Sequence, residues 1–468
     1  MGSTAENSPL TRLCARRLHR IATEPLKPEL KEKAILALLD YLSSVSAGLQ
    51  APWAPQVTKY AKARGTGTSF TWATKDNVSA ETAAFCNALL AHSAIRDDMH
   101  LPSNSHIGSM VISAALAVGQ RDGVSGENTL KAIIAGYEMS ALLGSSFQQT
   151  EGYNKHIRPS GSCGAFGAAA AAIVANFQDY SEDVATNALA FAANMASGFN
   201  QWAWTGGVEI YTEMGTAASS GITAFDVAKA GLQCSEDVLE GKAGFFAAFD
   251  VGNTAKTKFL EWLSRSEIGR GLIEVTFKPV PGCNYAQTPI AVAMKASESY
   301  REKKSKDSSL KVEEIIVRST SAAKNYPGCD NPAKKFDTVQ QTKMSIQFGV
   351  SAILLYGAPS EELFKRFDDR EITDLVAKCS VTPLDEFDQG MKTERRQPAS
   401  VEVKLSDGSS IKEQLDDVPW VNAAGVKERF KAEMQTITSK GKGEDLMQSI
   451  ISLEKHTDCS RMLSYFQI

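Results

Sequence analysis

The sequence predicts a mainly α-helical protein with a smaller α+β domain. Three observations lead to this fold class. Apolar residues recur at helical spacing through the first half of the chain, strand-forming residues gather in the third quarter, and helical spacing returns at the C-terminal end. Because 468 residues exceed what one hydrophobic core usually holds, we expect a helical domain over residues 1–268, an α+β domain over 269–416, and C-terminal helices over 417–468 that return to the helical domain.

The first half of the chain is a succession of predicted helices. Residues 31–47 (KEKAILALLDYLSSVSA) place Ile35 and Leu42 on one apolar stripe, the pattern of a helix with one buried face. Ser181, followed by two acidic residues, is a typical helix start. Frequent Ala and Gly inside these segments indicate helices that approach one another closely. Further helices are expected at residues 79–94, at 106–120, and from 128 or 129 to 143.

The third quarter of the chain has the composition of a sheet. Two segments rich in β-branched residues, LIEVTFKPV and LKVEEIIVRST, predict strands. A third segment, VEVKLSDGSSIKEQL, predicts a hairpin that turns at Asp407-Gly408. The expected strands cover residues 272–280, 310–320 and 401–415, with helices at 286–301 and 342–355 between them and at 424–438 and 443–454 after them.

Composition excludes several classes of function. Lys and Arg number 50 against 54 Asp and Glu, and a net charge of −4 gives no electrostatic footprint for nucleic acid. No segment approaches the ~20 apolar residues of a membrane span, so we expect neither nucleic acid nor a membrane as a partner. The eight cysteines form no Cys-x-x-Cys pair, which favours buried thiols over a zinc or redox motif. The N-terminus lacks the apolar core of a secretory signal, so we expect a cytoplasmic protein, with organelle targeting left open.

A first polar cluster lies between two strongly apolar predicted helices. It contains the pair Asp97-Asp98, followed by His100 and His106. Polar residues between buried helices are costly unless they are paired or used, and His106 stands at a helix start, where free N–H groups favour anions. The alternative is a helix-capping loop whose polar side chains satisfy backbone donors. The acidic pair could bind a cation, but no spaced set of partners is visible, so we predict no metal.

Two further clusters carry candidate residues. In KHIRPSGSCG, the Gly- and Ser-rich turn beside Arg158 suits a carboxylate, although tight helix packing through glycine is an equally good interpretation. In FKPVPGCNY, near the junction of the two domains, Lys278 is a candidate carboxylate clamp or, with its pKa depressed by burial, an acid. A solvated lysine is the alternative there.

Taken in order, these segments resemble the MmgE/PrpD family, which includes 2-methylcitrate dehydratase, cis-aconitate decarboxylase and an iminodisuccinate epimerase. The resemblance covers nearly the whole chain and rests on the order and spacing of LLDYLSSVSAGL, the acidic pair and its histidine, RPSGSCGAFGAAAAA, GTAASSGITAFDVAKAGL, FKPVPGCNYAQTPI and VEVKLSDGS. It implies a large helical domain built from both chain ends, a smaller α+β lid, and a homodimer that acts on a small polycarboxylate.

The resemblance assigns roles position by position. His106 falls on the family's loop histidine, implicated in catalysis, and Lys278 on the junction lysine. Asp97 and Asp98 match the acidic pair, and Tyr326, in KNYP, falls on a lid position that closes over substrate. The candidate catalytic residues are His106, Lys278, Asp98, His156 and Tyr326, and the candidate substrate-binding residues are Arg158, Asp97, His100, Arg96 and Ser160.

The sequence departs from the family pattern at several positions. Decarboxylase-like members have an Asp before the acidic pair and a Thr after it, a histidine before the Pro-Ser/Thr-Gly turn, and a late histidine in the junction motif. At these positions this sequence has Ile95, Met99, Arg158 and Gln287, and it has Glu209 or Ile210 where the family has a lysine. The resemblance therefore favours an alkylated or less highly charged acid over plain cis-aconitate.

The leading hypothesis is dehydration of a 2-alkylcitrate-type hydroxy acid by a metal-independent lyase without a cofactor. His106 is assigned as acid or base, Lys278 and Arg158 bind carboxylates, and Asp98 orients the loop. His156 and Tyr326 are second candidates for proton transfer. Epimerisation or isomerisation by the same proton abstraction, decarboxylation of the cis-aconitate type, and a catalytically dead homologue that only binds are the alternatives.

Overall fold

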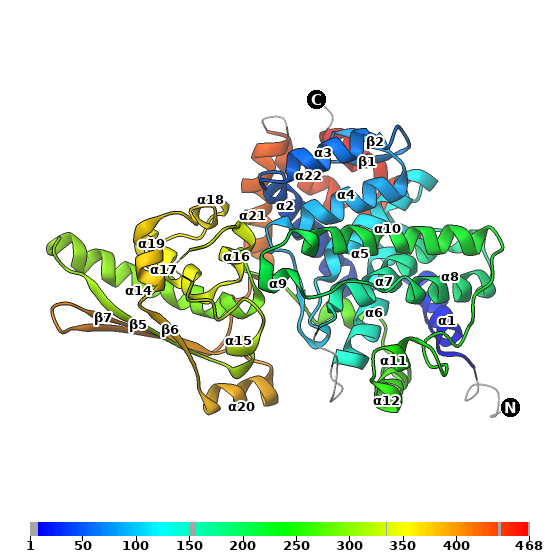
Figure 1. Ribbon diagram of the computed structural model, residues 1–468. Helices are drawn as coiled ribbons and strands as arrows, with labels where there is room; N and C mark the ends of the chain where they lie inside the picture. Colours follow the sequence, from blue (N-terminus) through cyan, green and yellow to red (C-terminus); the bar gives the residue numbers. More distant parts are fainter. Residues whose placement is uncertain (1–7, 149–155, 334, 439–440, 467–468) are drawn as a thin grey trace.

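The computed structural model describes residues 8–148, 156–333, 335–438 and 441–466, and it forms two lobes (Figure 1). Helices make up 62% of the chain and strands 9%, so the predicted fold class, mainly α with a small α+β part, is confirmed. Within the described residues, no helix combines the length and apolarity needed to cross a bilayer.

The large lobe is helical and holds two small two-stranded sheets, β1 with β2 and β3 with β4. Its elements in the first part of the chain are α1 (Leu10–Thr23), α2 (Pro28–Gly48), α3 (Ala54–Lys62), β1 (Ser69–Thr71), β2 (Asp76–Val78), α4 (Ala80–Ser93), β3 (Met99–His100), η1 (Leu101–Ser103), α5 (Ile107–Asp122), α6 (Gly126–Gln148), α7 (Pro159–Ala175), η2 (Phe177–Asp179), α8 (Glu182–Asn194), α9 (Trp202–Thr205), α10 (Glu209–Lys229), α11 (Phe245–Ala248), α12 (Gly252–Leu263), α13 (Arg270–Ile273) and β4 (Val275–Thr276).

Helix α7 lies at the centre of this lobe, where it packs against α5, α6, α8 and α10. Every residue from Pro159 to Ala175 is buried, which explains why the helix is apolar on all sides. Small residues allow the close approach: a Cβ at Gly136 of α6 would lie 2.9 Å from the main-chain oxygen of Gly167. The Ala- and Gly-rich sequence of α7 is therefore a consequence of its position in the core.

The small lobe is a four-stranded sheet covered by helices, with strand order β6-β5-β7-β8. Strands β5 and β6 are parallel, and β5–β7 and β7–β8 are antiparallel. Helix α14 packs against β7, β8 and α17. The elements are η3 (Asn284–Ala286), α14 (Gln287–Lys306), β5 (Val312–Ser319), α15 (Ser321–Asn325), α16 (Val339–Met344), α17 (Ile346–Tyr356), α18 (Glu361–Phe364), α19 (Arg370–Val376), β6 (Cys379–Pro383), α20 (Asp385–Glu394), β7 (Ala399–Leu405) and β8 (Ser410–Leu415).

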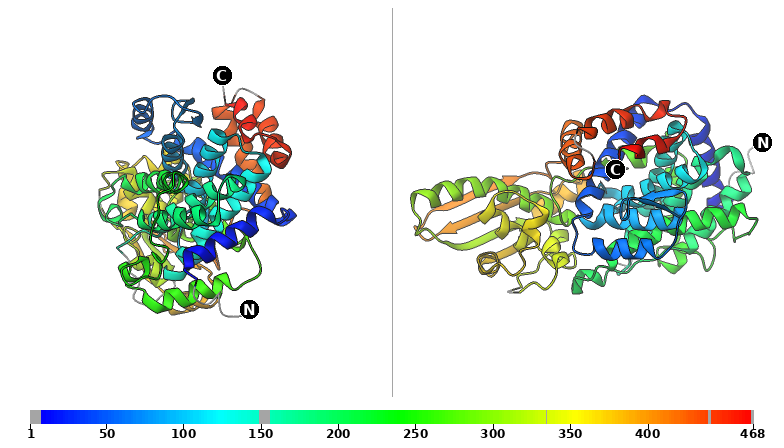
Figure 2. Two further views of the ribbon diagram at one scale, coloured as in Figure 1. Left: turned by 90° about the vertical axis from the view of Figure 1, so that its right-hand side faces the viewer. Right: turned by 90° about the horizontal axis from the view of Figure 1, so that it is seen from above.

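The C-terminal segment lies on the large lobe, where α21 (Ala423–Ile437) packs against α2. Helix α22 (Lys442–Ile451), η4 (Leu453–Lys455) and η5 (Cys459–Tyr465) follow it. Figure 2 shows these helices, in orange and red, beside the blue N-terminal helices of the large lobe. An ion pair between Arg429 and Asp40 joins α21 to α2, and Arg429 also donates to the main-chain oxygen of Lys278, 2.7 Å away.

The predicted strand at residues 272–280 is wrong for most of its length. The helix α13 extends to Ile273, and only Val275 and Thr276 pair, with β3. The two prolines that follow have no N–H to donate to a sheet, so the pairing stops before them. The predicted hairpin is confirmed as β7–β8, and Gly408 at its turn has a φ of 79°.

Candidate active site

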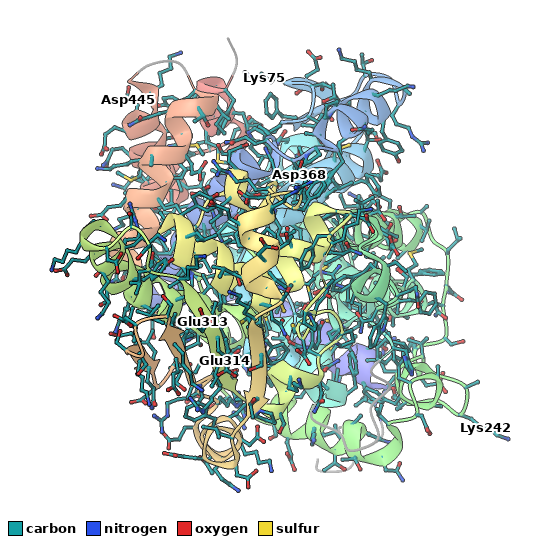
Figure 3. All side chains as sticks on the ribbon, turned by 60° about the vertical axis from the view of Figure 1, so that its left-hand side comes forward. Lys75, Lys242, Glu313, Glu314, Asp368 and Asp445 are labelled. Atoms are coloured by element: carbon teal, nitrogen blue, oxygen red, sulfur yellow. The ribbon has the colours of Figure 1, made fainter. Side chains whose placement is uncertain are left out.

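A pocket lies where the large lobe meets the start of the small lobe. Exposed charged side chains such as Lys75, Lys242 and Asp445 lie at the edge of the molecule (Figure 3). The pocket differs because buried charged side chains lie behind its walls. Its free volume is ≈40 Å³ in this structure, room for a few water molecules. Its lining residues are His92, Ile95, Met99, Asn104, His106, Arg158, Pro159, Ser160, Trp202, Ile210, Cys283, Asn284, Tyr285, Tyr326 and Met344.

His106 is the residue at this pocket best suited to accept a proton. It is the N-cap of α5, and its side chain is 13% exposed. Nδ1 lies 2.8 Å from the main-chain oxygen of Asp98. A carbonyl oxygen only accepts, so Nδ1 carries the proton and Nε2 keeps its lone pair. Among the described residues, Nε2 has no hydrogen-bond partner, so it is available to a ligand.

Behind His106, three buried side chains form a chain of hydrogen bonds. Arg158 Nη2 donates to His92 Nε2 at 2.7 Å. Because a guanidinium only donates, the opposite nitrogen of His92 carries the proton and donates to the carboxylate of Asp97, 2.9 Å from either oxygen. One oxygen of Asp97 is 3.6 Å from Nδ1 of His106. The network therefore holds a carboxylate close to the protonated nitrogen of the candidate base.

Arg158 is fixed by several contacts at once. It is the N-cap of α7 and donates to the main-chain oxygen of Ile210 at 2.5 Å and to Glu213 at 3.1 Å. Its guanidinium also lies 5.5 Å from the ring centre of Trp202. These contacts, together with the bond to His92, use three of the five guanidinium N–H groups, so two are left for an anion in the pocket.

Asp98 lies beneath the base and is fully enclosed. It accepts from the Tyr137 hydroxyl at 2.6 Å and from the Gly108 main-chain N–H at 3.0 Å. Burial, and then the nearby charge of Asp97, raise the pKa of Asp98 to about 8. The side chain is thus a neutral acid at pH 7 that anchors the loop, while its main-chain oxygen fixes the tautomer of His106.

Lys278 is buried behind the pocket wall and does not line the pocket. Its ammonium donates to the main-chain oxygens of Ile95 and Gly282, at 3.0 and 3.2 Å. Burial lowers the pKa of Lys278 to about 8, and the charge of Asp97 is the largest effect that opposes the shift. At neutral pH Lys278 contributes a positive charge through the wall.

The charges set the protonation states of the cluster. Burial, followed by the charge of Lys278, lowers the pKa of His106 well below its usual range, and Asp97 opposes this. Burial lowers the pKa of His92 to about 4. Burial would raise the pKa of Asp97, but His92 and His106 outweigh it and hold it below the usual range. The site therefore contains two neutral imidazoles and an ionised Asp97.

Two helix N-termini add to the positive potential. Helices α5 and α7 begin at His106 and Arg158, side by side, and the His106 main-chain N–H donates to the hydroxyl of Ser160 at 3.1 Å. The free N–H groups of a first helical turn favour anions. The arrangement suits a carboxylate near Ser160.

The remaining wall of the pocket is largely apolar, formed by Ile95, Met99, Trp202, Ile210 and Met344. Ile95 follows the end of α4 with a φ of 50°, a left-handed conformation that is strained for a β-branched residue. This conformation aims its main-chain oxygen at Lys278. Ile95 and Met99 therefore contribute apolar surface to the pocket.

The structure brings four of the predicted residues to the pocket itself: His106, Arg158, Ser160 and Tyr326. Asp97, Asp98 and Lys278 lie directly behind it. Burial raises the pKa of the Tyr326 phenol well above 10, so it is a neutral hydroxyl.

Three predicted residues do not reach the pocket. His100 is buried in β3, where it bonds Ser103 and lies 3.4 Å from Glu274. Arg96 turns away to Glu433 of α21 and to the main-chain oxygen of Ser43. His156 is exposed before α7 and does not line the pocket. His100 and Arg96 have structural partners, since buried polar groups that serve no ligand need bonds elsewhere.

Sequence reasoning missed His92 and Glu213. His92 is in the last turn of the Ala-rich helix α4 and is fully buried. A polar residue at the end of an apolar helix, five positions before Asp97, was the available signal. Gln287 has a structural role, because its side chain bonds the main chain of Val280, Gly282 and Cys283.

His92, Asp97 and His106 also offer ligand atoms within 4.8 Å of one another, a spacing that a metal ion could bridge. A metal would have to replace the bonds of His92 to Arg158 and Asp97. The positive charges of Arg158 and Lys278 would also repel it. The donor set fits a hydrogen-bonded network better, and metal independence stays a prediction.

Comparison with known proteins identifies two matching family models. The MmgE/PrpD N-terminal domain matches residues 12–258, and the MmgE/PrpD C-terminal domain matches residues 280–425. Cis-aconitate decarboxylase of Aspergillus terreus (strain NIH 2624 / FGSC A1156) is 23% identical over 468 residues, covering 95% of this chain and 93% of that protein. Cis-aconitate decarboxylase of Homo sapiens is 24% identical over 466 residues, covering 96% of this chain and 93% of that protein.

Proposed function

Because the chain belongs to the MmgE/PrpD family, we propose that it is a lyase for citrate-like acids that dehydrates a 2-alkylcitrate-type hydroxy acid. The observation that carries the proposal is the state of His106. Its Nδ1–H is bound to the main-chain oxygen of Asp98, its Nε2 is available to the pocket, and its pKa is lowered, so it is a neutral base at pH 7.

In the proposed reaction, Nε2 of His106 removes a proton from the carbon next to a substrate carboxylate. The C–H bond breaks, and its electron pair is delocalised onto that carboxylate. The imidazolium that forms is stabilised by Asp97, whose oxygen lies 3.6 Å from Nδ1. An ionised carboxylate at this distance favours the charged ring without taking its proton.

The charge that develops on the substrate carboxylate needs positive groups fixed in advance. Arg158 has two N–H groups left for it, and the first turn of α7 offers the hydroxyl and N–H of Ser160. Lys278 adds a positive charge through the wall. Such preorganised groups act strongly because the pocket excludes most water.

The second half of the reaction breaks the C–O bond and forms the alkene. The leaving hydroxide takes a proton and departs as water. Tyr326 is the candidate donor, since its phenol is neutral and lines the pocket opposite the large-lobe residues. The His106 imidazolium is the alternative donor, which would return the abstracted proton to the leaving group.

The apolar wall supports an alkylated substrate. Three of its residues, Ile95, Met99 and Ile210, are apolar. By the resemblance, Ile95 and Met99 stand where decarboxylase-like members have an Asp and a Thr, and Ile210 or Glu209 stands where the family has a lysine. An alkyl substituent buried against them would contribute about 0.8 kcal/mol for each CH₂. A further carboxylate placed there would lose its hydration without gaining a partner.

Decarboxylation is the second candidate, because the relatives named above are cis-aconitate decarboxylases. In that reaction the C–C bond to a carboxylate breaks in place of the C–O bond. Epimerisation by the same proton abstraction is a third, since His106 serves it equally well.

The deciding experiment is proton NMR of chelator-treated protein in deuterated water with citrate, methylcitrate, longer alkylcitrates and cis-aconitate. We expect a new alkene signal from an alkylcitrate, with no metal added. Loss of carbon dioxide from cis-aconitate would favour the decarboxylase. Deuterium entering recovered substrate without an alkene would favour the epimerase, and either of these results would overturn the dehydratase assignment.

A further inference from the structure

A groove continues from the pocket along the junction of the two lobes. It shares Asn104, Asn284 and Tyr285 with the pocket, so the two spaces are contiguous. On the far side it is lined by Lys392, Arg395 and Gln397, from the end of α20 and the segment that leads into β7. A ligand held at His106 therefore has a path toward the small lobe.

Two buried amides in this groove have unused hydrogen-bonding capacity. Asn284 Nδ2 donates to Gln397 Oε1 at 3.1 Å, and the two residues are only 7% and 6% exposed. Within the described part of the chain, Oδ1 of Asn284 and Nε2 of Gln397 have no partner. The oxygen and nitrogen of an amide can be assigned either way round. If both amides are turned, they still bond each other, and one acceptor and one donor still have no partner. Buried polar atoms of this kind are costly unless a ligand satisfies them.

The groove also contains two cations. Lys392, in the last turn of α20, and Arg395, its C-cap residue, both line the groove. Among the described residues neither forms an ion pair, because the nearby Glu394 bonds Arg396. Two exposed positive charges beside an open amide donor are suited to a carboxylate.

We propose that this groove binds a distal carboxylate of the substrate, so that one arm of the acid passes Asn284 and Tyr285 and ends at Lys392, Arg395 and Gln397. The inference rests on the proposed function, because it takes the reacting end to lie at His106. The substrate is then an extended polyacid, anchored at both ends, and the amide of Asn284 marks the passage between the two subsites.

The test compares two unreactive probes by calorimetric titration. Both are alkyl-substituted tricarballylates of equal length, which lack the hydroxyl to be eliminated; one arm ends in a carboxylate and the other in a methyl group. We expect the wild-type protein to bind the carboxylate probe at least about tenfold more tightly. The double variant Lys392→Ala/Arg395→Gln should lose this preference and bind the methyl probe unchanged.

Lys303→Ala is the matched control, since it removes an exposed charge from the same lobe outside the groove. It should keep the preference for the carboxylate probe. Equal affinity of the wild-type protein for both probes, or equal losses in the double variant and the control, would overturn the subsite. Because binding is measured without turnover, this result stays separate from the alkene test of the dehydratase.

Discussion

The main-chain oxygen of Asp98 lies 2.8 Å from Nδ1 of His106. This contact fixes the imidazole tautomer without a charged partner on that nitrogen, while the ionised Asp97 lies slightly farther away, at 3.6 Å. The main-chain oxygen of Asp98 thus orients the His106 ring, and the carboxylate of Asp97 raises its pKa. A backbone atom cannot titrate, so the orientation persists across the pH range in which the enzyme works.

His106→Ala should lower kcat by about 10²- to 10⁴-fold, the usual contribution of a positioned general base. The melting temperature should change little, because the ring lies at the pocket edge. His156→Ala is the control: that histidine is exposed and outside the pocket, so kcat should be unaffected. Full activity in His106→Ala, or loss of activity in His156→Ala, would reverse the assignment.

The pH profile of kcat/KM should fall on both sides of neutrality. On the acid side, activity is lost only when His106 is protonated, and its lowered pKa moves this limb well below pH 6.5. On the alkaline side, the Lys278 pKa of about 8 implies that its positive charge is lost as the pH passes 8. A profile that stays flat from pH 6 to 10 would contradict this view of Lys278.

Asp97→Asn and Lys278→Met should move the acid limb in opposite directions. Asp97 raises the pKa of His106, so its neutral replacement should shift the limb to lower pH. Lys278 lowers that pKa, so Lys278→Met should shift the limb to higher pH and weaken the alkaline limb near pH 8, to which Asp98 also contributes. Each variant should also lose kcat, on the order of 10²-fold, as expected when a fixed charge near the reacting centre is removed. If the acid limb moved in the same direction in both variants, the two residues would support the fold of the site and would not set the pKa of His106 through their charges.

Local sequence signals predicted much of the fold. Helices such as α2 and α5 follow from their apolar spacing, although both are buried on all sides over most of their length, from Ala34 to Gly48 and from Ile107 to Gly119. The hairpin β7–β8 follows from Asp407-Gly408. The strand expected at 272–280 failed because strand-forming composition says nothing about whether a pairing partner is in reach. Here only the two residues of β3 are available.

The candidate site was predicted only in part, because some of its contacts, like the pairing of β4, join segments that are far apart in the sequence. His106 and Arg158 stood out because each precedes an apolar helix in a polar segment. His92 did not, because its role depends on Arg158, 66 positions away in the chain. His100 and Arg96 resembled site residues locally, but their partners are Glu274, between α13 and β4, and Glu433 of α21. Partners this distant are set by tertiary packing, which no local pattern encodes.

Gly161→Ala tests the packing of α7 under the site. A Cβ at this position would lie 2.3 Å from the main-chain oxygen of Ser197, and backbone atoms cannot move aside. We expect a loss of about 1–3 kcal/mol in the free energy of unfolding, together with reduced kcat/KM, since Ser160 is adjacent. Gly390→Ala in α20 is the control, because its nearest neighbour would be 3.9 Å away, and it should stabilise by up to about 1 kcal/mol.

Ile210→Ala tests whether the apolar wall selects the alkyl group. Ile210 is 2% exposed and lines the pocket, and its main-chain oxygen, which binds Arg158, is kept in the variant. We expect kcat/KM for a short alkylcitrate to fall about tenfold or more, the effect of one or two lost methylene contacts. Turnover of unsubstituted citrate, if measurable, should fall far less, because it places nothing against that wall. Because the two substrates are compared on the same variant, a general loss of stability would lower both rates together. Parallel losses would therefore show that Ile210 supports the fold of the pocket and that alkyl selection lies elsewhere.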